Sequence, residues 1–255
     1  MQSCKILMSN LGYARGIGGS LAEHVLNAHR HFYCSEAVQR KTLVQLGKLI
    51  VEEDPDICCF AEIDKGSFTS AGFNQLEALL NEKYLFFDIE NKYAPSSRLR
   101  SFFMTSGRCN AFIAKRPIPH HKLYFRSGVK RLIYKIKIAE HLTLFFAHFS
   151  LSRRLRHMQL IEARKLLDET PGESVFLGDF NILDGLRELD PLLKNSPYIL
   201  LNRDEPTFRF HKRHLTLDLC ICSRELERRT HLRIVPQPYS DHAALMLDIH
   251  ANQMR

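Results

Sequence analysis

The stretch Ser174-Val175-Phe176-Leu177-Gly178-Asp179-Phe180-Asn181 joins an apolar run to a polar ending. The apolar residues predict a short buried strand over Ser174–Asp179. Burying a carboxylate beside such a run is costly unless the carboxylate is paired or bound to a metal. Gly-Asp-Phe-Asn by itself also fits a tight turn held by an Asx hydrogen bond. The rest of the chain decides between a turn and a functional strand end.

Polar residues mark the ends of other apolar runs as well. They are Asn10, Glu62, His148, Asp218, Asp241 and His242. A lone asparagine or histidine at a strand end is usually a turn residue or a satisfied core group, so the inference depends on the ordered set. Because several strands end in this way, we expect these side chains to converge on a common cleft.

The chain alternates short apolar runs with turn signals and two helical patterns. The first helix is expected over Ser35–Glu53, with Ser35 as its N-cap, and the second over Arg153–Glu169. Ten strands are too many for a comfortable single open sheet, so two packed sheets covered by helices are expected. The strands are expected at Cys4–Asn10, Ile57–Ile63, Tyr84–Ile89, Asn110–Lys115, Leu132–Ile138, Leu142–Phe149, Ser174–Asp179, Leu215–Cys222, Leu232–Val235 and Ala243–Ile249. No linker or repeat divides the chain, which predicts a single domain over residues 1–255.

Composition restricts the class of protein. With 45% hydrophobic residues the chain can bury a core, and it has no apolar run of about 18 residues that would span a membrane. A net charge of +8 suits a polyanionic partner, although a solvated basic surface explains it equally well. The first ten residues lack a signal-peptide core, so we expect a cytoplasmic protein.

Cysteines and glycines give two further expectations. The seven cysteines lie mostly in apolar runs and lack zinc-site spacing, which predicts buried reduced thiols. The glycine-rich stretch Gly12–Ser20 has neither a P-loop ending nor a dinucleotide-binding pattern. We therefore expect it to be a flexible loop beside the site.

Taken in order, these motifs make the sequence resemble the endonuclease/exonuclease/phosphatase superfamily. The resemblance implies an α/β (α+β) fold, a four-layer α-β-β-α sandwich of two packed mixed sheets with helices outside. The matching pieces span nearly the whole chain: Ser9–Leu11, Asp54–Glu62, Cys109–Ile118, Phe146–Phe149, Leu177–Asn181, Pro206–Phe208, Leu217–Ile221 and Ser240–Ala243.

The resemblance also implies a reaction and a metal. The reaction is hydrolysis of a phosphodiester by in-line attack of an activated water, with Mg²⁺ or Mn²⁺ as cofactor. Glu62 is expected to bind the metal, with Asn10 and Asp241 beside it, because hard oxygen ligands suit these ions.

The catalytic roles implied by the resemblance fall on five residues. Asp179 orients or deprotonates the water, and Asn181 donates a hydrogen bond to the phosphoryl group. His242 contacts that group and is oriented by Asp218. His148 contacts phosphate or helps to protonate the leaving group.

Departures from family patterns leave the substrate open. Abasic-site endonucleases have an aromatic hydroxyl where this chain has Ser106-Gly107-Arg108, so Arg108 or Asn110 is expected to contact phosphate instead. The chain has no tryptophan to open a duplex, and the inositol phosphatases' signature is absent around Asp218. The substrate is expected to be nucleic acid or another phosphodiester. The alternatives are a phosphomonoesterase or phospholipid-headgroup phosphodiesterase, and an inactive binding scaffold.

Overall fold

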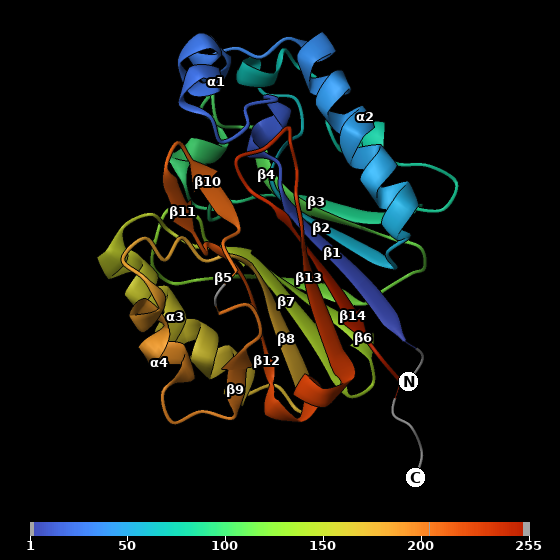
Figure 1. Cartoon of the computed structure of the whole chain (residues 1–255), viewed down its shortest axis with the longest axis vertical. Helices are drawn as coiled ribbons and strands as arrows, with labels where there is room; N and C mark the ends of the chain where they lie inside the picture. Colours follow the sequence, from blue (N-terminus) through green and yellow to red (C-terminus); the bar gives the residue numbers. More distant parts are fainter. Residues whose placement is uncertain (1–2, 204, 252–255) are drawn as a thin grey trace.

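The computed structural model describes residues 3–203 and 205–251, in which two six-stranded β-sheets pack face to face between outer helices (Figure 1). The first sheet has the order β13-β14-β1-β2-β4-β3, with β1 and β2 parallel and its other neighbours antiparallel. Its strands are β1 (Cys4–Asn10), β2 (Ile57–Asp64), β3 (Phe86–Asn91), β4 (Arg108–Ala114), β13 (Thr230–Val235) and β14 (Ala244–Ile249).

The second sheet has the order β5-β6-β7-β8-β12-β9 and is also mixed, because β7 and β8 are parallel. Its strands are β5 (His120–Tyr124), β6 (Leu132–Ala139), β7 (Leu142–His148), β8 (Glu173–Asp179), β9 (Tyr198–Leu200) and β12 (Asp218–Ser223). A separate hairpin pairs β10 (Phe208–Phe210) with β11 (Arg213–Leu215).

The helices cover the outer faces of the two sheets. Helix α2 (Glu36–Glu53) buries Leu43, Leu46 and Ile50 in the cluster on the outer face of the first sheet. Helices α3 (Arg153–Asp168) and α4 (Asp190–Leu193) cover the second sheet, and the short α1 (Leu21–Leu26) lies at the top of Figure 1. In the part of the chain that the structure describes, seven 3₁₀ turns link these elements: Gly12–Ala14, Ala28–His31, Phe68–Ser70, Glu77–Leu79, Arg98–Arg100, Leu186–Leu189 and Arg224–Arg229. None of the described helices is long and apolar enough to cross a membrane.

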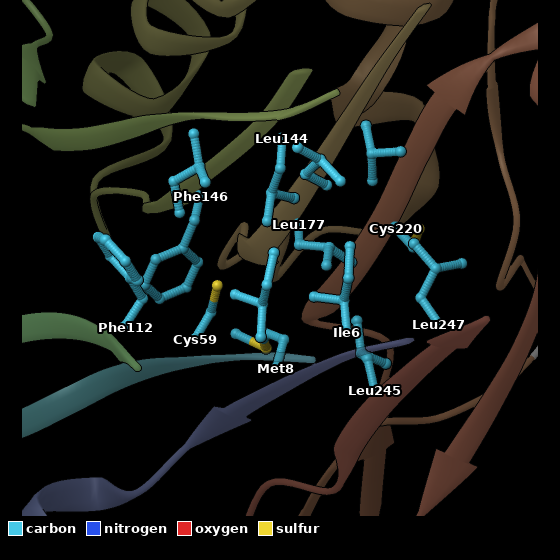
Figure 2. Packing of buried hydrophobic residues seen from close by; sticks show 14 of the residues in the cluster. Ile6, Met8, Cys59, Phe112, Leu144, Phe146, Leu177, Cys220, Leu245 and Leu247 are labelled. Carbon is cyan, nitrogen blue, oxygen red and sulfur yellow. The ribbon is translucent and has the colours of Figure 1, made fainter. Parts of the chain in front are cut away.

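The central core lies between the two sheets. Figure 2 shows Met8 and Cys59 of the first sheet packed toward Leu144, Phe146 and Leu177 of the second. These five side chains are fully buried. All seven cysteines are likewise buried and free, as predicted. Because both sheets contribute to one apolar layer, the ends of their strands are held close together.

The observed architecture confirms the predicted four-layer sandwich of mixed sheets. Nine of the expected strands and both expected helices correspond to observed elements, with shifts of up to two residues at their ends. The expected strand Leu215–Cys222 is confirmed only from Asp218 onward, because β11 ends at Leu215 and β12 begins at Asp218. The backbone N–H groups of Leu217 and Asp218 donate to Thr207 Oγ1 at 3.0 and 2.8 Å, so the chain turns there instead of continuing one strand.

Two local expectations are also modified. Ser35 occupies the N-cap position of α2, but its side chain makes no capping hydrogen bond. The stretch Gly12–Ser20 contains local structure at both ends, because Gly12–Ala14 form a 3₁₀ turn and Ser20 caps α1 with a capping box to Glu23. This places a structured segment directly after Asn10.

Candidate active site

Three site residues lie side by side at one end of the second sheet. In the strand register His148 is the partner of Asp179, and Asp179 is the partner of Asp218. Residues paired across neighbouring strands project to the same face of a sheet. Gly178 makes this pairing close, because a Cβ atom there would lie only 1.9 Å from the carbonyl oxygen of Ala147.

The first sheet contributes Asn10 and Glu62 at the matching end. Asn10 is the last residue of β1 and pairs with Ala61 of β2. Glu62 follows at a β-bulge, where the β2–β4 register shifts between Phe60 and Ile63, and its φ is +52°. A bulge redirects a side chain, and here it points the Glu62 carboxylate toward the second sheet.

Contacts across the two sheets join these residues into one site. The Nδ2 atom of Asn10 donates to Asp179 Oδ2 at 3.0 Å and lies 3.4 Å from His242 Nε2. The other ring nitrogen of His242, Nδ1, donates to Asp218 Oδ2 at 2.7 Å. The loop before β14 thus places His242 between the ends of both sheets.

Charge on the Asp218–His242 pair is set by its surroundings. Burial alone would lower the pKa of His242, but the carboxylates of Asp218, Asp179 and Asp241 outweigh burial and raise the pKa to about 10. Burial raises the pKa of Asp218, which remains below neutrality. At pH 7 the pair therefore consists of an imidazolium and a carboxylate.

His148, unlike His242, is uncharged at neutral pH. Burial, together with the positive charge of Lys130, lowers the pKa of His148 to about 4, so the ring is neutral at pH 7. Its Nε2 atom lies 3.1 Å from Asp179 Oδ2 and is also contacted by the Lys130 ammonium group. Burial would raise the pKa of Asp179, but His148 and His242 lower it, and this carboxylate is ionised.

Glu62 is partly exposed and faces two lysines. Its Oε1 atom lies 3.2 Å from Lys92 Nζ and 3.8 Å from Lys130 Nζ. Burial would raise the pKa of Glu62, but these ammonium groups outweigh it and lower the pKa well below the ordinary value. Burial, and secondly Lys92, lower the pKa of Lys130 to about 8. Glu62 is therefore an ionised carboxylate with an open edge.

The oxygen atoms around the site fit a divalent cation. Glu62, Asn10, Asp179 and Asp241 supply carboxylate and amide oxygens, which Mg²⁺ and Mn²⁺ prefer. Burial raises the pKa of Asp241, and the negative charge of Glu62 raises it further, so a cation near both would relieve repulsion. Among the described residues, Asp179, Asp218 and His242 also form a group whose ligand atoms lie within 4.8 Å of one another.

Asn181 and Thr207 make hydrogen bonds that hold the side chains and strand ends of the candidate site. The Asn181 backbone, with φ +51°, donates to Asp179 Oδ1 at 3.0 Å, and its Nδ2 donates to the carbonyl oxygen of Phe149 at 2.9 Å. One N–H of that amide remains for another acceptor. The Oγ1 atom of Thr207 accepts a hydrogen bond from the backbone N–H of Asp218, and the carbonyl oxygen of Thr207 accepts one from the backbone N–H of Ala243. Both residues therefore hold the strand ends in register.

The remaining expected residues lie around this centre. Asp241 lines a cleft with His242, Thr207 and His214, and its carboxylate lies 3.9 Å from His24 Nε2. Asn110 is buried in β4, and its Oδ1 has no hydrogen-bond partner among the residues that the structure describes.

Arg108, the other residue expected to contact phosphate, and the nearby Arg98 and Arg100 have different surroundings. Arg108 lines a pocket that also contains Glu62. Arg100 is paired with Glu90 at 2.8 Å, and Arg98 is exposed.

Sequence reasoning missed Tyr13, Arg15, Lys92 and Lys130, which also line the Glu62 pocket. Lys92 directly follows β3, so its place after a strand was a usable signal. No sequence pattern indicates that this lysine is buried, because most lysines are exposed. Its exposed fraction is only 3%.

Comparison with known proteins identifies the class. The Endonuclease/Exonuclease/phosphatase family matches residues 33–242. Among curated proteins no match is found. Among the solved structures that share the fold are a TDP2, a retrotransposon endonuclease domain and a bacterial family member.

Zebrafish (D. rerio) TDP2 complexed with a single-strand DNA product is 13% identical, with a TM-score of 0.66 over 98% of this chain and 100% of that one. The endonuclease domain of TRAS1, a telomere-specific non-LTR retrotransposon, is 13% identical, with a TM-score of 0.60 over 97% and 98%. An endonuclease/exonuclease/phosphatase from Bacteroides vulgatus is 14% identical, with a TM-score of 0.64 over 99% and 100%.

The fold is a sandwich of two β-sheets, and carboxylate and imidazole groups lie together where the strand ends of the two sheets meet. The chain belongs to the endonuclease/exonuclease/phosphatase family. Membership supports a metal-dependent phosphoesterase in general.

Proposed function

We propose that this chain hydrolyses phosphodiester bonds with Mg²⁺ or Mn²⁺ as cofactor. The observation that carries the proposal is the line of contacts from Asp218 through His242 and Asn10 to Asp179, at 2.7, 3.4 and 3.0 Å. It places a cationic imidazole and an ionised carboxylate on either side of an amide donor. Phosphoryl transfer needs such groups, because negative charge develops in the transition state.

In this proposal the metal site is formed by Glu62, Asn10 and Asp241. Glu62 has an ionised carboxylate that is partly exposed, and its negative charge raises the pKa of Asp241. A divalent cation bound there would supply positive charge to the phosphoryl oxygens. The Asp179, Asp218 and His242 group fits a metal less well, because the short Asp218–His242 contact already pairs two of its members.

The catalytic roles follow from the charge states. Asp179, held by Asn10 and Asn181, orients or deprotonates the attacking water. His242 donates to the phosphoryl group while Asp218 fixes its orientation. Asn181 uses its free amide N–H for the same group. His148 is neutral at pH 7 and contacts a Lys130 ammonium, which favours a phosphate contact over proton donation to the leaving group.

Nucleic acid is the substrate class that the comparisons favour. One similar structure holds a single-strand DNA product, and another is an endonuclease domain. The net charge of +8 suits a polyanionic strand. A cytoplasmic location is part of the same proposal, and it is supported by seven free, buried cysteines, which persist in reducing compartments.

Site variants test the assignment. Asp179→Asn and His242→Gln should each lower turnover of bis(p-nitrophenyl) phosphate by at least about 100-fold, the range typical of lost acid–base and electrostatic groups. Asp190→Asn on α4 is the matched control, because this exposed carboxylate lies outside the site. Equal turnover in the two site variants and in the control would remove the basis of the proposal.

A further inference from the structure

A basic pocket beside Glu62 is not used by the proposed chemistry. It has a volume of about 460 Å³ and is called here the Tyr13 pocket. Its polar and charged lining includes Tyr13, Arg15, Lys92, Arg108, Lys130 and Ser150, and Glu62 forms the wall shared with the candidate active site. A pocket of this size accommodates a small organic group with its phosphate.

Positive charge in the pocket surrounds one aromatic ring. The guanidinium carbons of Arg15 and Arg108 lie 4.7 and 5.2 Å from the Tyr13 ring centroid, and Lys92 Nζ lies 4.9 Å from it. An aromatic face attracts a cation only weakly. Three cations around the same ring also repel one another, and the ring alone does not compensate for this repulsion.

Negative charge in the pocket is limited to one carboxylate. Among the described residues that line it, Glu62 is the only acidic one. Lys92 and Lys130 both approach the same oxygen of Glu62, and neither arginine pairs with it. In the proposed function Glu62 also binds the metal, so its single negative charge is divided between the two lysines and the cation. The pocket therefore has an excess of positive charge that an anion can neutralise.

Two donors in the pocket have no acceptor. Arg108 Nε and Ser150 Oγ are buried atoms without a hydrogen-bond partner anywhere in residues 3–203 and 205–251. Ser150 as a residue is 3% exposed. Buried donors are almost always satisfied, and those left over call for a ligand or an ordered water. A phosphate offers several acceptors at once, and guanidinium groups match its geometry.

We propose that the Tyr13 pocket binds a second phosphate of the substrate, a dianionic phosphomonoester placed next to the scissile phosphodiester. The inference rests on the proposed function, because Glu62 joins the pocket to the site of hydrolysis. Four cationic side chains match a doubly charged monoester better than a singly charged diester. Val129, Leu151 and Leu155, which also line the pocket, pack against the organic group that carries this phosphate.

Matched substrates test the inference. Thymidine 3′-(p-nitrophenyl phosphate) is compared with the same compound bearing a 5′-phosphate, and an analogous pair is built on glycerol. The wild-type protein with Mg²⁺ should release p-nitrophenol with a kcat/KM at least about tenfold higher for the phosphorylated member, as expected from one charge-assisted phosphate contact. Preference within the thymidine pair, the glycerol pair or both supports the pocket and shows which carrier it accepts.

Arginine variants test whether the preference for the phosphorylated substrate comes from the Tyr13 pocket. In Arg108→Gln, and separately in Arg15→Gln, the ratio between the two substrates should fall toward one, and because it is a ratio it is independent of the amount of folded protein. Arg116→Gln is the matched control, since Arg116 is exposed just beyond the opposite end of β4, and its ratio should equal that of the wild type.

Failures of the two proposals are distinguishable. Equal hydrolysis of phosphorylated and unphosphorylated members, or an unchanged ratio in both arginine variants, overturns the second-phosphate site and leaves the proposed function intact. No metal-dependent hydrolysis of any member overturns the proposed function, and the inference with it.

Discussion

Glu62 and Asn181 share an unusual backbone conformation, with φ of +52° and +51°. Asparagine adopts it readily, whereas a glutamate there carries a cost of order 1–3 kcal/mol. Strained residues of this kind cluster at sites where the geometry matters more than local stability. Both residues could be predicted as site residues because they follow apolar runs. The β-bulge that turns Glu62 toward the second sheet could not be predicted from the sequence.

The charge of His242 can be measured directly. In EDTA, NMR titration should give an imidazole pKa near 10, and Asp218→Asn should lower it by more than one unit, because the adjacent carboxylate is lost. Since the folded pKa of His242 is above the ordinary 6.5, the proton on His242 contributes stability that is fully present below about pH 6.5 and is lost as the pH rises toward 10. A pKa near 6.5 in the wild type would contradict the ion pair.

At the scale of elements, the strands that could be predicted are the long apolar ones. β5, β9, β10 and β11 escaped prediction because three of them have only three residues and β5 begins with two histidines and a lysine. Such short strands at sheet edges and in a hairpin owe their existence to pairing with a neighbour rather than to their own pattern. The buried Lys92 and the partly buried Lys130 could not be recognised from the sequence for the same reason, since only packing shows their burial.

Close packing of β7 on β8 depends on Gly178. Gly178→Ala should lower the free energy of unfolding by about 1–3 kcal/mol, because its new methyl group would overlap the Ala147 carbonyl oxygen. Gly47→Ala on α2 is the control, since nothing lies within 4 Å of its Cβ position and alanine favours a helix by about 1 kcal/mol. Urea unfolding of both variants decides the matter, and a Gly178→Ala protein as stable as the wild type would refute this account of the strand pair.

At the scale of the whole molecule, both sheets share one buried layer (Figures 1 and 2). The candidate site lies where the ends of their strands meet. Sequence motifs could predict the meeting of strand ends, since the motifs fall at the ends of strands from both halves of the chain. The contacts of His242 with Asp218 and Asn10 required the tertiary arrangement, because these three residues come from the last loop, β12 and β1.

A shared core predicts a single unfolding unit over the described chain, as expected for one domain. Phe146→Ala should cost about 3–5 kcal/mol, and far-UV and near-UV signals should still change together in one transition. The comparison is between the two spectroscopic curves of the same variant in urea. Two separate transitions would show that the sheets unfold independently.

Metal-dependent hydrolysis at the joined strand ends is the central claim. Its most direct test is the initial rate of bis(p-nitrophenyl) phosphate hydrolysis by purified protein, first with Mg²⁺, then after EDTA, then after Mg²⁺ or Mn²⁺ is restored. The account predicts that EDTA lowers the wild-type rate to that of Asp179→Asn and that the restored ion returns it, while Asp179→Asn stays inactive throughout. A rate that EDTA leaves unchanged, or that Asp179→Asn shares with the wild type, would contradict it.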